Sequence, residues 1–389
     1  MISRREFTAL SAFGAMTSFM APLAFADAPT KKRLIFINLK GAMDGLHALA
    51  PYADSDYRKL RPTLGLGFPG TDKGVLDLDG SFGLHPALTA FQSLYRSKEL
   101  LFVPAVSTQY RRRSHFEAQN MLEGGGASPY QQKTGWLNRA IQQMGASPNR
   151  IGLSLGPTLP LIMQGQADVR TWSDSRLPEA GEDFLNRVSG LYDNDPILHK
   201  AFKQAYETET DPDSMKNMRL GNGRLELSMT AALSILKEKN APRIAVIESG
   251  GWDTHFAQER RLGKLFRELG NSLALIKSEL GPVWQDTVVM IVSEFGRTAA
   301  ENGSNGTDHG TGGLAIMAGG NIKGGKIRGT WPGLSASALF SERDLAPSNQ
   351  LEGLFMSTLV HHIGLTENQV ADHVFPSINN IKMMEDLYH

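Results

Sequence analysis

The sequence predicts an α/β fold in which a mostly parallel sheet carries helices on both faces. Short runs of β-branched and other apolar residues alternate along the chain with longer segments of helical periodicity. Each apolar run is closed by polar or glycine residues, as is typical of strands buried on both faces. The length of 389 residues fits one large domain with insertions.

The N-terminal residues 1–26 predict a Tat signal peptide. Ser3-Arg4-Arg5-Glu6-Phe7 is a twin-arginine pattern, a mildly apolar segment follows over Leu10–Phe25, and Ala24-Phe25-Ala26 offers a cleavage site. The apolar segment is too short to serve as a stable membrane anchor. We therefore expect a periplasmic or secreted protein that meets the Tat translocase during export.

Five apolar runs predict the buried strands of the sheet, because each is short, rich in β-branched residues and bounded by polar residues or glycine. They are, in chain order, Leu34–Leu39, Leu100–Pro104, Ile244–Ile247, Thr287–Val292 and Leu314–Met317.

Helices are predicted between these strands. His85-Pro86 opens one that runs to about Arg96, with proline at an acceptable first-turn position. Residues 134–144 and Leu351–His362 also have helical periodicity, and a long apolar stripe runs from Leu262 to Leu280 at helical spacing.

The strand pattern fades between residues 161 and 240. This segment contains helical patterns and the polar stretch "YETETDPDSMKN". We interpret it as a helical insertion within a single domain that spans residues 27–389.

Charge and cysteine content restrict the class of partner. Lys plus Arg and Asp plus Glu number 40 each, so the formal net charge is zero. This balance gives no reason to expect nucleic acid as a partner. The chain has no cysteine, so no disulfide or thiolate ligand is available.

Ionisable side chains follow the predicted strands, and in open α/β sheets ligands bind where strands end. Carboxylates and imidazoles are ligands that suit Zn²⁺, Mn²⁺ or a related divalent ion better than a soft metal. We expect one or two such ions. The candidate ligands are Asp44 after the first strand, Asp253 and His255 after the third, Glu294 after the fourth, and Asp308 and His309 in the glycine-rich loop that follows.

Some of these residues also have purely structural interpretations. Asp44 could cap a helix that starts near Gly45, and Asp253 could cap the helix after "SGGWDTH". Glu294 ends a very apolar strand, so its carboxylate needs a cation or a hydrogen-bond partner. Arg297 could be that partner, or it could bind an anionic substrate.

The segment "RRRSHFEAQ" after the second strand contains the candidate catalytic residues. Ser114 precedes a predicted helix, and with Glu117 it could form a capping box. The same position would also suit a nucleophile, because the helix N-terminus and nearby cations stabilise an anion. In that interpretation Arg113 and Arg297 bind the anion and His115 lies beside the nucleophile.

Seven short motifs resemble those of a bacterial family of Tat-exported proteins of unknown function, within the alkaline phosphatase-like superfamily that includes sulfatases and cofactor-independent phosphoglycerate mutases. The resemblance covers about Lys31 to Gly364. The motifs are "FINLKGAMDGL", "RRRSHFEAQNML", "GWLNRA", "GGWDTH", "SEFGRT", "NGTDHG" and "GTWPGL".

The resemblance implies an α/β sheet with two metal sites and specific roles for several residues. It implies Asp44 as an acidic ligand, Ser114 as nucleophile, Asp253 with His255 as a ligand pair, and His309 as a further ligand. Two departures stand out. Glu294-Phe295 occupies the place of an Asp-His pair, and no Cys-x-Pro-x-Arg or Ser-x-Pro-x-Arg sequence supports formylglycine chemistry.

Three functions remain open from the sequence. The first is an exported metal-dependent hydrolase of a phosphate or sulfate ester, whose substrate is a small molecule or a glycan. The second is a non-catalytic periplasmic binding or assembly protein on the same fold. The third is a transferase that acts on envelope phosphoglycans.

Overall fold

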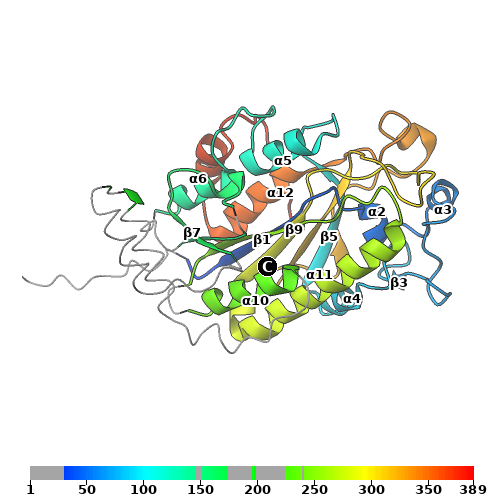
Figure 1. Cartoon of the computed structure of the whole chain (residues 1–389), viewed down its shortest axis with the longest axis horizontal. Coiled ribbons are helices and arrows are strands. Elements are labelled where there is room, and N and C mark those ends of the chain that lie inside the picture. The colour runs from blue at the N-terminus through cyan, green and yellow to red at the C-terminus, as the bar shows by residue number, and fades with distance from the viewer. Residues whose placement is uncertain are drawn as a thin grey trace, which may run out of the picture.

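A computed structural model describes residues 30–145, 151–156, 158–173, 195, 197–198, 224–238 and 241–389. Its core is a sheet sandwiched between two layers of helices, as Figure 1 shows. The predicted signal peptide, residues 1–26, lies outside the described residues.

The described residues contain one large sheet in the strand order β11-β5-β10-β9-β1-β8-β6-β7, with β12 also paired to β5. All five predicted strands are confirmed, and four further strands join them. The bounds are β1 (Arg33–Leu39), β5 (Leu100–Ser107), β6 (Gly152–Leu155), β7 (Val169–Trp172), β8 (Ile244–Ser249), β9 (Thr287–Val292), β10 (Gly313–Gly319), β11 (Lys326–Ile327) and β12 (Asn349–Gln350).

Strand direction brings four loops to one edge of this sheet. β1 pairs in parallel with β8 and β9, whereas β10 runs antiparallel to both β9 and β5. The carboxyl ends of β1, β5, β8 and β9 and the start of β10 therefore share one rim. The sheet is mostly parallel as predicted, and β10 is the exception because the rim loop 293–312 returns the chain into the sheet beside β9.

Helices cover both faces of the sheet (Figure 1). One layer contains α4 (Thr89–Arg96), α10 (Arg224–Leu236) and α11 (Gln258–Leu280), and the other contains α5 (His115–Gly124), α6 (Trp136–Gln143) and α12 (Leu351–Thr358). The central strand β1 alternates between the two cores: Ile35 and Ile37 pack with the first, and Leu34 and Phe36 with the second. This two-residue period confirms the α/β sandwich.

Short elements complete the described chain. They are α2 (Gly45–Ala48), α3 (Ser55–Leu60), α13 (Glu367–Gln369), a small sheet of β2 (Leu49–Ala50), β3 (Leu76–Asp77) and β4 (Gly83–Leu84), the 3₁₀ turns Leu161–Met163, Gly281–Asp286 and Ala336–Ala338, and the π turns Leu359–Ile363 and Val370–Val374.

The predicted helical insertion, residues 161–240, falls largely outside the described residues. Where it is described, β7 extends the edge of the sheet beside β6, and α10 packs against α11. The strand β7 has no counterpart in our prediction. The extent of the insertion and the single-domain boundary of 27–389 stay predictions.

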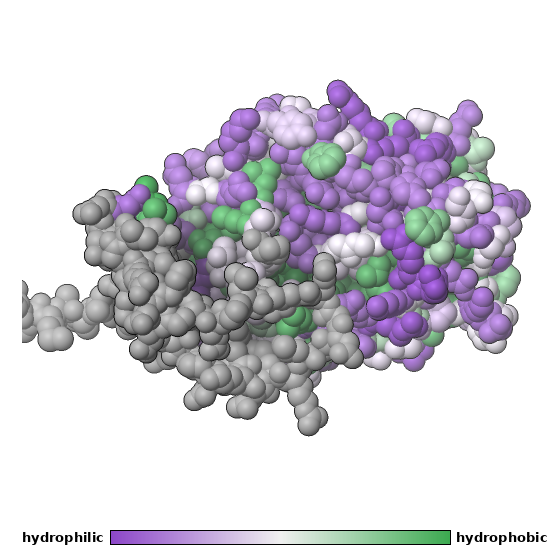
Figure 2. All heavy atoms as spheres, viewed as in Figure 1, coloured by the Kyte–Doolittle hydropathy of each residue, from purple (hydrophilic) through white to green (hydrophobic). Residues whose placement is uncertain are grey.

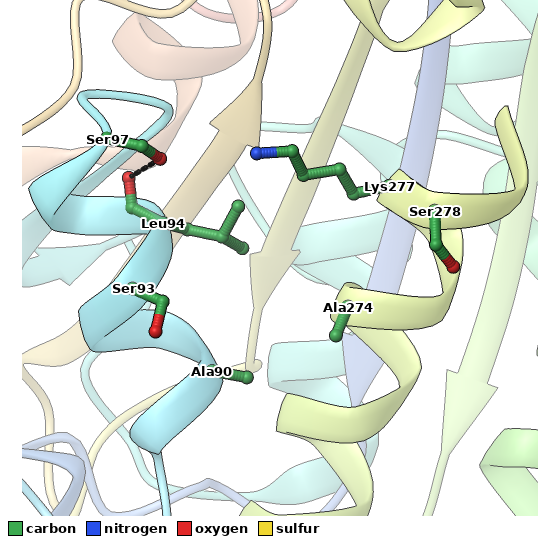
Figure 3. Close-up of a pocket in the computed structure, with 7 residues that line it drawn as sticks. All are labelled: Ala90, Ser93, Leu94, Ser97, Ala274, Lys277 and Ser278. Carbon is green, nitrogen blue, oxygen red and sulfur yellow. Dashed lines mark hydrogen bonds between the residues drawn. The ribbon is translucent and has the colours of Figure 1, made fainter. Parts of the chain in front are cut away.

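The described surface in Figure 2 is mainly hydrophilic, with apolar residues scattered over it. No helix among the described residues is long and apolar enough to cross a membrane. An open depression lies between α4 and α11 (Figure 3), lined by Leu94, Ala274, Lys277 and small neighbours. The ammonium of Lys277 is paired with Glu99, and this end of α11 is remote from the rim.

An aromatic cluster in the second core generates a stability prediction. Trp136 is fully buried, stacks on Phe355 at 4.7 Å between ring centroids and meets Phe36 edge-on at 5.7 Å. Replacing Trp136 with alanine leaves a large cavity, so the free energy of unfolding should fall by about 3–5 kcal/mol. Urea unfolding measures it. Phe68→Ala is the control, since that ring is 50% exposed. Equal losses in both variants would contradict the assignment of Trp136 to the core.

Candidate metal centre

Four rim loops contribute the side chains that meet at the carboxyl edge of the sheet. They follow β1, β5 and β8 and connect β9 to β10. Gly41 in the first loop has a φ of +117°, and a Cβ at this position would lie 2.5 Å from the backbone nitrogen of Asp253. Only glycine lets the first and third loops approach this closely.

His115, Asp253 and His309 form a cluster whose potential ligand atoms all lie within 4.8 Å of one another. The Nε2 atoms of His115 and His309 are 2.9 Å apart. The Asp253 carboxylate is 3.5 Å from Nε2 of His115 and 3.4 Å from Nε2 of His309. Three donors from three different loops thus converge on one point.

His255 joins this cluster from the loop after β8. Its Nε2 lies 3.0 Å from Nε2 of His309 and 3.0 Å from the Asp253 carboxylate. The four side chains are between 24% and 43% exposed, so the cluster is open to solvent.

Each imidazole is oriented by an acceptor on its other ring nitrogen. Nδ1 of His115 lies 2.6 Å from Oε1 of Glu294, and Nδ1 of His255 lies 3.2 Å from Oδ1 of Asp308. Nδ1 of His309 lies 3.1 Å from the backbone carbonyl of Arg113, which can only accept a hydrogen bond. This arrangement of an acceptor behind each imidazole is typical of metal-binding histidines.

The hydrogen bonds at Nδ1 determine what the three Nε2 atoms present to one another. A neutral imidazole that donates from Nδ1 carries a lone pair on Nε2. Three such lone pairs and the Asp253 carboxylate would face one another at about hydrogen-bond distance with no proton between them. A cation relieves this repulsion, so the residues present fit a divalent metal ion.

The pKa shifts at the cluster follow from these contacts. The hydrogen bond that His115 donates to Glu294 raises the pKa of His115 against the effect of burial. Burial, followed by the charge of His115, lowers the pKa of His309. Burial alone would raise the pKa of Asp253, but the hydrogen bond and charge of Arg297 outweigh it and the pKa is lowered. The cluster therefore holds Asp253 as an anion.

We expected Glu294 and Asp308 to be metal ligands, but neither is a member of the cluster. Each lies behind an imidazole and accepts a hydrogen bond from its Nδ1. Glu294 is 1% exposed and also accepts hydrogen bonds from the Gly41 amide and the Ser293 hydroxyl, at 2.9 Å each. We had expected His115 beside the nucleophile. Its imidazole instead lies in the cluster, at the place where we had expected the carboxylate of Glu294.

Arg297 is not the exposed anion-binding residue that we expected. It is 2% exposed, and its guanidinium donates to the carbonyls of Ala42 at 2.8 Å and Thr307 at 3.0 Å and to the carboxylate of Asp253. Its donors are taken up by loops of the rim. The correction follows from burial, because a guanidinium enclosed by carbonyl oxygens has no face left for a substrate.

Asp44 adopts its structural alternative and lies outside the cluster. It caps α2, with Oδ1 accepting from the amide of His47 at 3.1 Å. Its Oδ2 accepts from Arg61 at 2.8 Å and from Gln258 at 2.6 Å. The carboxylate is fully buried and its oxygens are already coordinated by these donors, so the implied role of Asp44 as a ligand has no support in this geometry.

Ser114 is the residue before α5, but the predicted capping box does not form. Its side chain makes no hydrogen bond to the first turn of α5. Glu117 instead accepts a hydrogen bond from the hydroxyl of Tyr110 at 2.6 Å, and this hydroxyl accepts from the Ser114 amide at 3.1 Å. The first-turn amides of α5 therefore have no side-chain cap from Ser114.

The chain on either side of Ser114 is held to the cluster. Arg113 accepts from His309 through its carbonyl, and His115 is a member of the cluster. Arg113 has a φ of +66°, a strained conformation for a non-glycine residue that is common at functional sites. Ser114 thus lies between two residues that are positioned by the same centre.

Sequence reasoning missed Arg343 and Asp344 near the cluster. Arg343 donates to the carbonyl of His309 at 3.0 Å, and Asp344 accepts from Arg113 at 2.7 Å. Both follow a turn with no recognisable motif. The only sequence feature that could have indicated a site here is the adjacent arginine and aspartate in "FSERD", and such a pair is common on protein surfaces.

Residues 31–375 match the family described as "Protein of unknown function (DUF1501)". The chain belongs to that family. No curated protein matches the sequence.

Several solved structures are similar to this member of the family at 9–10% sequence identity. Murine ectonucleotide pyrophosphatase/phosphodiesterase 5 has a TM-score of 0.34, covering 68% of this chain and 57% of its own. The lipoteichoic acid synthase LtaP from Listeria monocytogenes has a TM-score of 0.37, with 93% and 76% covered. A protein in the alkaline phosphatase superfamily from Vibrio parahaemolyticus has 0.36, with 85% and 72% covered.

The buried ion pair behind the cluster generates a second prediction. Arg61 is 0% exposed and donates to Asp44 and to the carbonyls of Thr298 and Ala299. Arg61→Ala leaves a buried carboxylate without its cation, so we expect the free energy of unfolding to fall by about 3–5 kcal/mol. Thermal or urea unfolding measures this loss.

The control for Arg61 is Lys59→Ala, in helix α3, which ends directly before Arg61. Lys59 pairs with Asp56 at 2.9 Å, but its side chain is 71% exposed. An exposed pair contributes about 0–1 kcal/mol. If Arg61→Ala were as mild as Lys59→Ala, the buried network would not be supporting the rim.

Proposed function

We propose that this protein is an exported, metal-dependent hydrolase of a phosphate or sulfate ester, with Ser114 as the nucleophile. The observation that carries the proposal is the convergence of three imidazole Nε2 atoms and one carboxylate at the rim, each imidazole oriented from behind. Structural zinc sites are closed, whereas catalytic ones keep a position open for water or substrate. The solvent exposure of these side chains supports the catalytic kind.

His115, Asp253 and His309 would hold the ion, and His255 would be a fourth ligand or a neighbour. A nitrogen-rich set with one carboxylate suits Zn²⁺ or Mn²⁺. Such an ion supplies Lewis acidity and lowers the pKa of a hydroxyl or water close to it. Among the described residues one group of three potential ligands meets at this place, which supports a single bound ion here.

The residues around Ser114 favour attack on an anionic ester. Its hydroxyl does not cap α5, so the first-turn amides of this ten-residue helix remain available to an oxyanion. The helix dipole adds to this attraction. Ser114 Oγ would lose its proton to solvent and form a bond to phosphorus or sulfur as the bond to the leaving oxygen breaks. Water would then attack the same phosphorus or sulfur atom and release the group from the serine.

Export through the twin-arginine pathway is part of the proposal. It is supported by the N-terminal pattern Ser3-Arg4-Arg5-Glu6-Phe7 and by the small-residue cleavage site at Ala24-Phe25-Ala26. Export by this route after folding would allow the metal to be acquired before translocation.

The metal content of the purified protein tests the centre first. We expect about one equivalent of Zn²⁺ or Mn²⁺ in the wild type by mass spectrometry, and its loss in the double variant Asp253→Ala/His255→Ala, because metal sites depend on ligand identity and number. The matched control, Asp386→Ala/His389→Ala, removes the same residue types at the C-terminus and should keep its metal. A wild type that stays empty after incubation with both ions would refute the metal centre.

Ser114→Ala tests the proposed nucleophile. In a screen of phosphate and sulfate esters, turnover of the metal-loaded protein should fall on the order of 10³-fold or more, because the covalent step is lost. Ser128→Ala, which removes the same hydroxyl from an exposed position beyond α5, should leave turnover unchanged.

Three other outcomes would redirect the function of this site. Undiminished turnover in Ser114→Ala would mean that water attacks directly. A metal-loaded wild type with no turnover, whose ligand binding is unaffected by Ser114→Ala, would favour a binding protein. Transfer of the group to an added alcohol in preference to water would identify a transferase.

A further inference from the structure

Two arginines beside the metal centre share one buried carboxylate. Nε of Arg113 donates to Oδ2 of Asp344 at 2.7 Å, and Nη1 of Arg343 donates to Oδ1 of the same residue at 3.0 Å. The side chain of Asp344 is 0% exposed, whereas those of Arg113 and Arg343 are 28% and 42% exposed. The carboxylate therefore anchors two guanidinium groups that reach the surface.

Both arginines are also attached to His309 of the cluster. The carbonyl of Arg113 accepts from Nδ1 of His309 at 3.1 Å, and Nη1 of Arg343 donates to the carbonyl of His309 at 3.0 Å. The pair is thus placed at the metal centre from two segments of the chain that are distant in sequence.

Each guanidinium keeps donors that the protein does not use. Within the described part of the chain, no acceptor contacts Nη1 or Nη2 of Arg113, or Nε or Nη2 of Arg343. Two guanidinium groups with one carboxylate leave a net positive charge. A planar guanidinium with free N–H groups is suited to bind the oxygens of phosphate or sulfate.

The backbone before Arg343 forms a strained turn, and backbone hydrogen bonds hold this turn in place. Ser341 and Glu342 have φ values of +53° and +54°, both in the left-handed region, although neither is glycine. The turn is closed by the Phe340 amide on the carbonyl of Asp344 at 2.9 Å, and Ala299 donates to the carbonyl of Arg343 at 3.1 Å. Such strain persists only where the surroundings hold it, and it is concentrated at binding sites.

We propose that Arg113 and Arg343 form an anion clamp that binds the non-bridging oxygens of the phosphate or sulfate group of the substrate, with Asp344 as the positioning residue that sets the two guanidinium groups. The clamp takes the role that we had expected of Arg297, whose donors are used by the rim itself. This inference rests on the proposed function, since it assigns the recognition of the substrate anion at the same centre.

Binding of inorganic phosphate tests the clamp without any knowledge of the ester. Phosphate is titrated calorimetrically into the purified protein, with sulfate as a second probe, and the metal content of every sample is measured. Arg343→Ala should weaken phosphate binding by roughly 10- to 100-fold, as expected for the loss of a charge-assisted hydrogen bond. Arg343→Lys should restore part of the loss, because it returns the charge without the planar geometry.

Arg96→Ala is the matched control, since it removes the same charge from an exposed position at the end of α4. It should bind phosphate like the wild type. Asp344→Asn should weaken binding in the wild type but have no further effect in Arg113→Ala/Arg343→Ala, because a positioning residue acts only through the groups it orients.

The outcomes separate the clamp from the metal centre. Wild-type affinity in Arg343→Ala, or a metal-loaded wild type that binds neither anion, would overturn the clamp and leave the metal centre intact. A metal-free wild type that binds phosphate and loses it in Arg343→Ala would support the clamp while the metal-dependent function fails.

Discussion

The geometry of the rim depends on the hydrogen bonds that the buried guanidinium of Arg297 donates. It donates to the carbonyls of Gly41 and Ala42 after β1, of Trp252 after β8, and of Thr307 between β9 and β10. Buried carbonyls without donors cost free energy, so one side chain satisfies three loops that have no regular structure of their own. The same group also donates to Asp253, which couples the packing of the loops to the position of a proposed metal ligand.

A second buried arginine explains why the first rim position has lost the role that the resemblance implies. Arg61, the residue directly after α3, donates to Asp44 and also to the carbonyls of Thr298 and Ala299. Gln258, at the start of α11, donates to the same carboxylate. Asp44 thus connects α2, α3 and α11 beneath the loop that carries His309. In this arrangement the carboxylate of Asp44 supports the loop of a proposed ligand, His309.

The fold was predictable because its signals are local, whereas the roles of the site residues were only partly so. Continuous apolar runs fixed the five strands, and the rim followed from where they end. The direction of β10 was not predictable, because it depends on how the loop 293–312 returns to the sheet. A carboxylate at the rim can bind a metal ion directly, or it can orient an imidazole that lies between it and the ion. His115 lies in front of Glu294 because of tertiary packing, which the sequence pattern does not reveal. Arg343 lies in an irregular turn that leaves no periodic signal.

The charge around the imidazoles indicates what the centre requires. Three carboxylates contact the imidazole cluster, from Asp253 within it and from Glu294 and Asp308 behind it. Arg297 offsets the charge of Asp253. The two remaining negative charges face imidazoles whose Nε2 atoms converge, and a divalent cation would balance the charge and be bound by these nitrogens. A single bound proton could relieve only one contact, for instance that between His115 and His309. Arg113, Arg343 and the carboxylate they share, Asp344, add one net positive charge outside this balance. This charge supports the anionic ester that we propose as the substrate class.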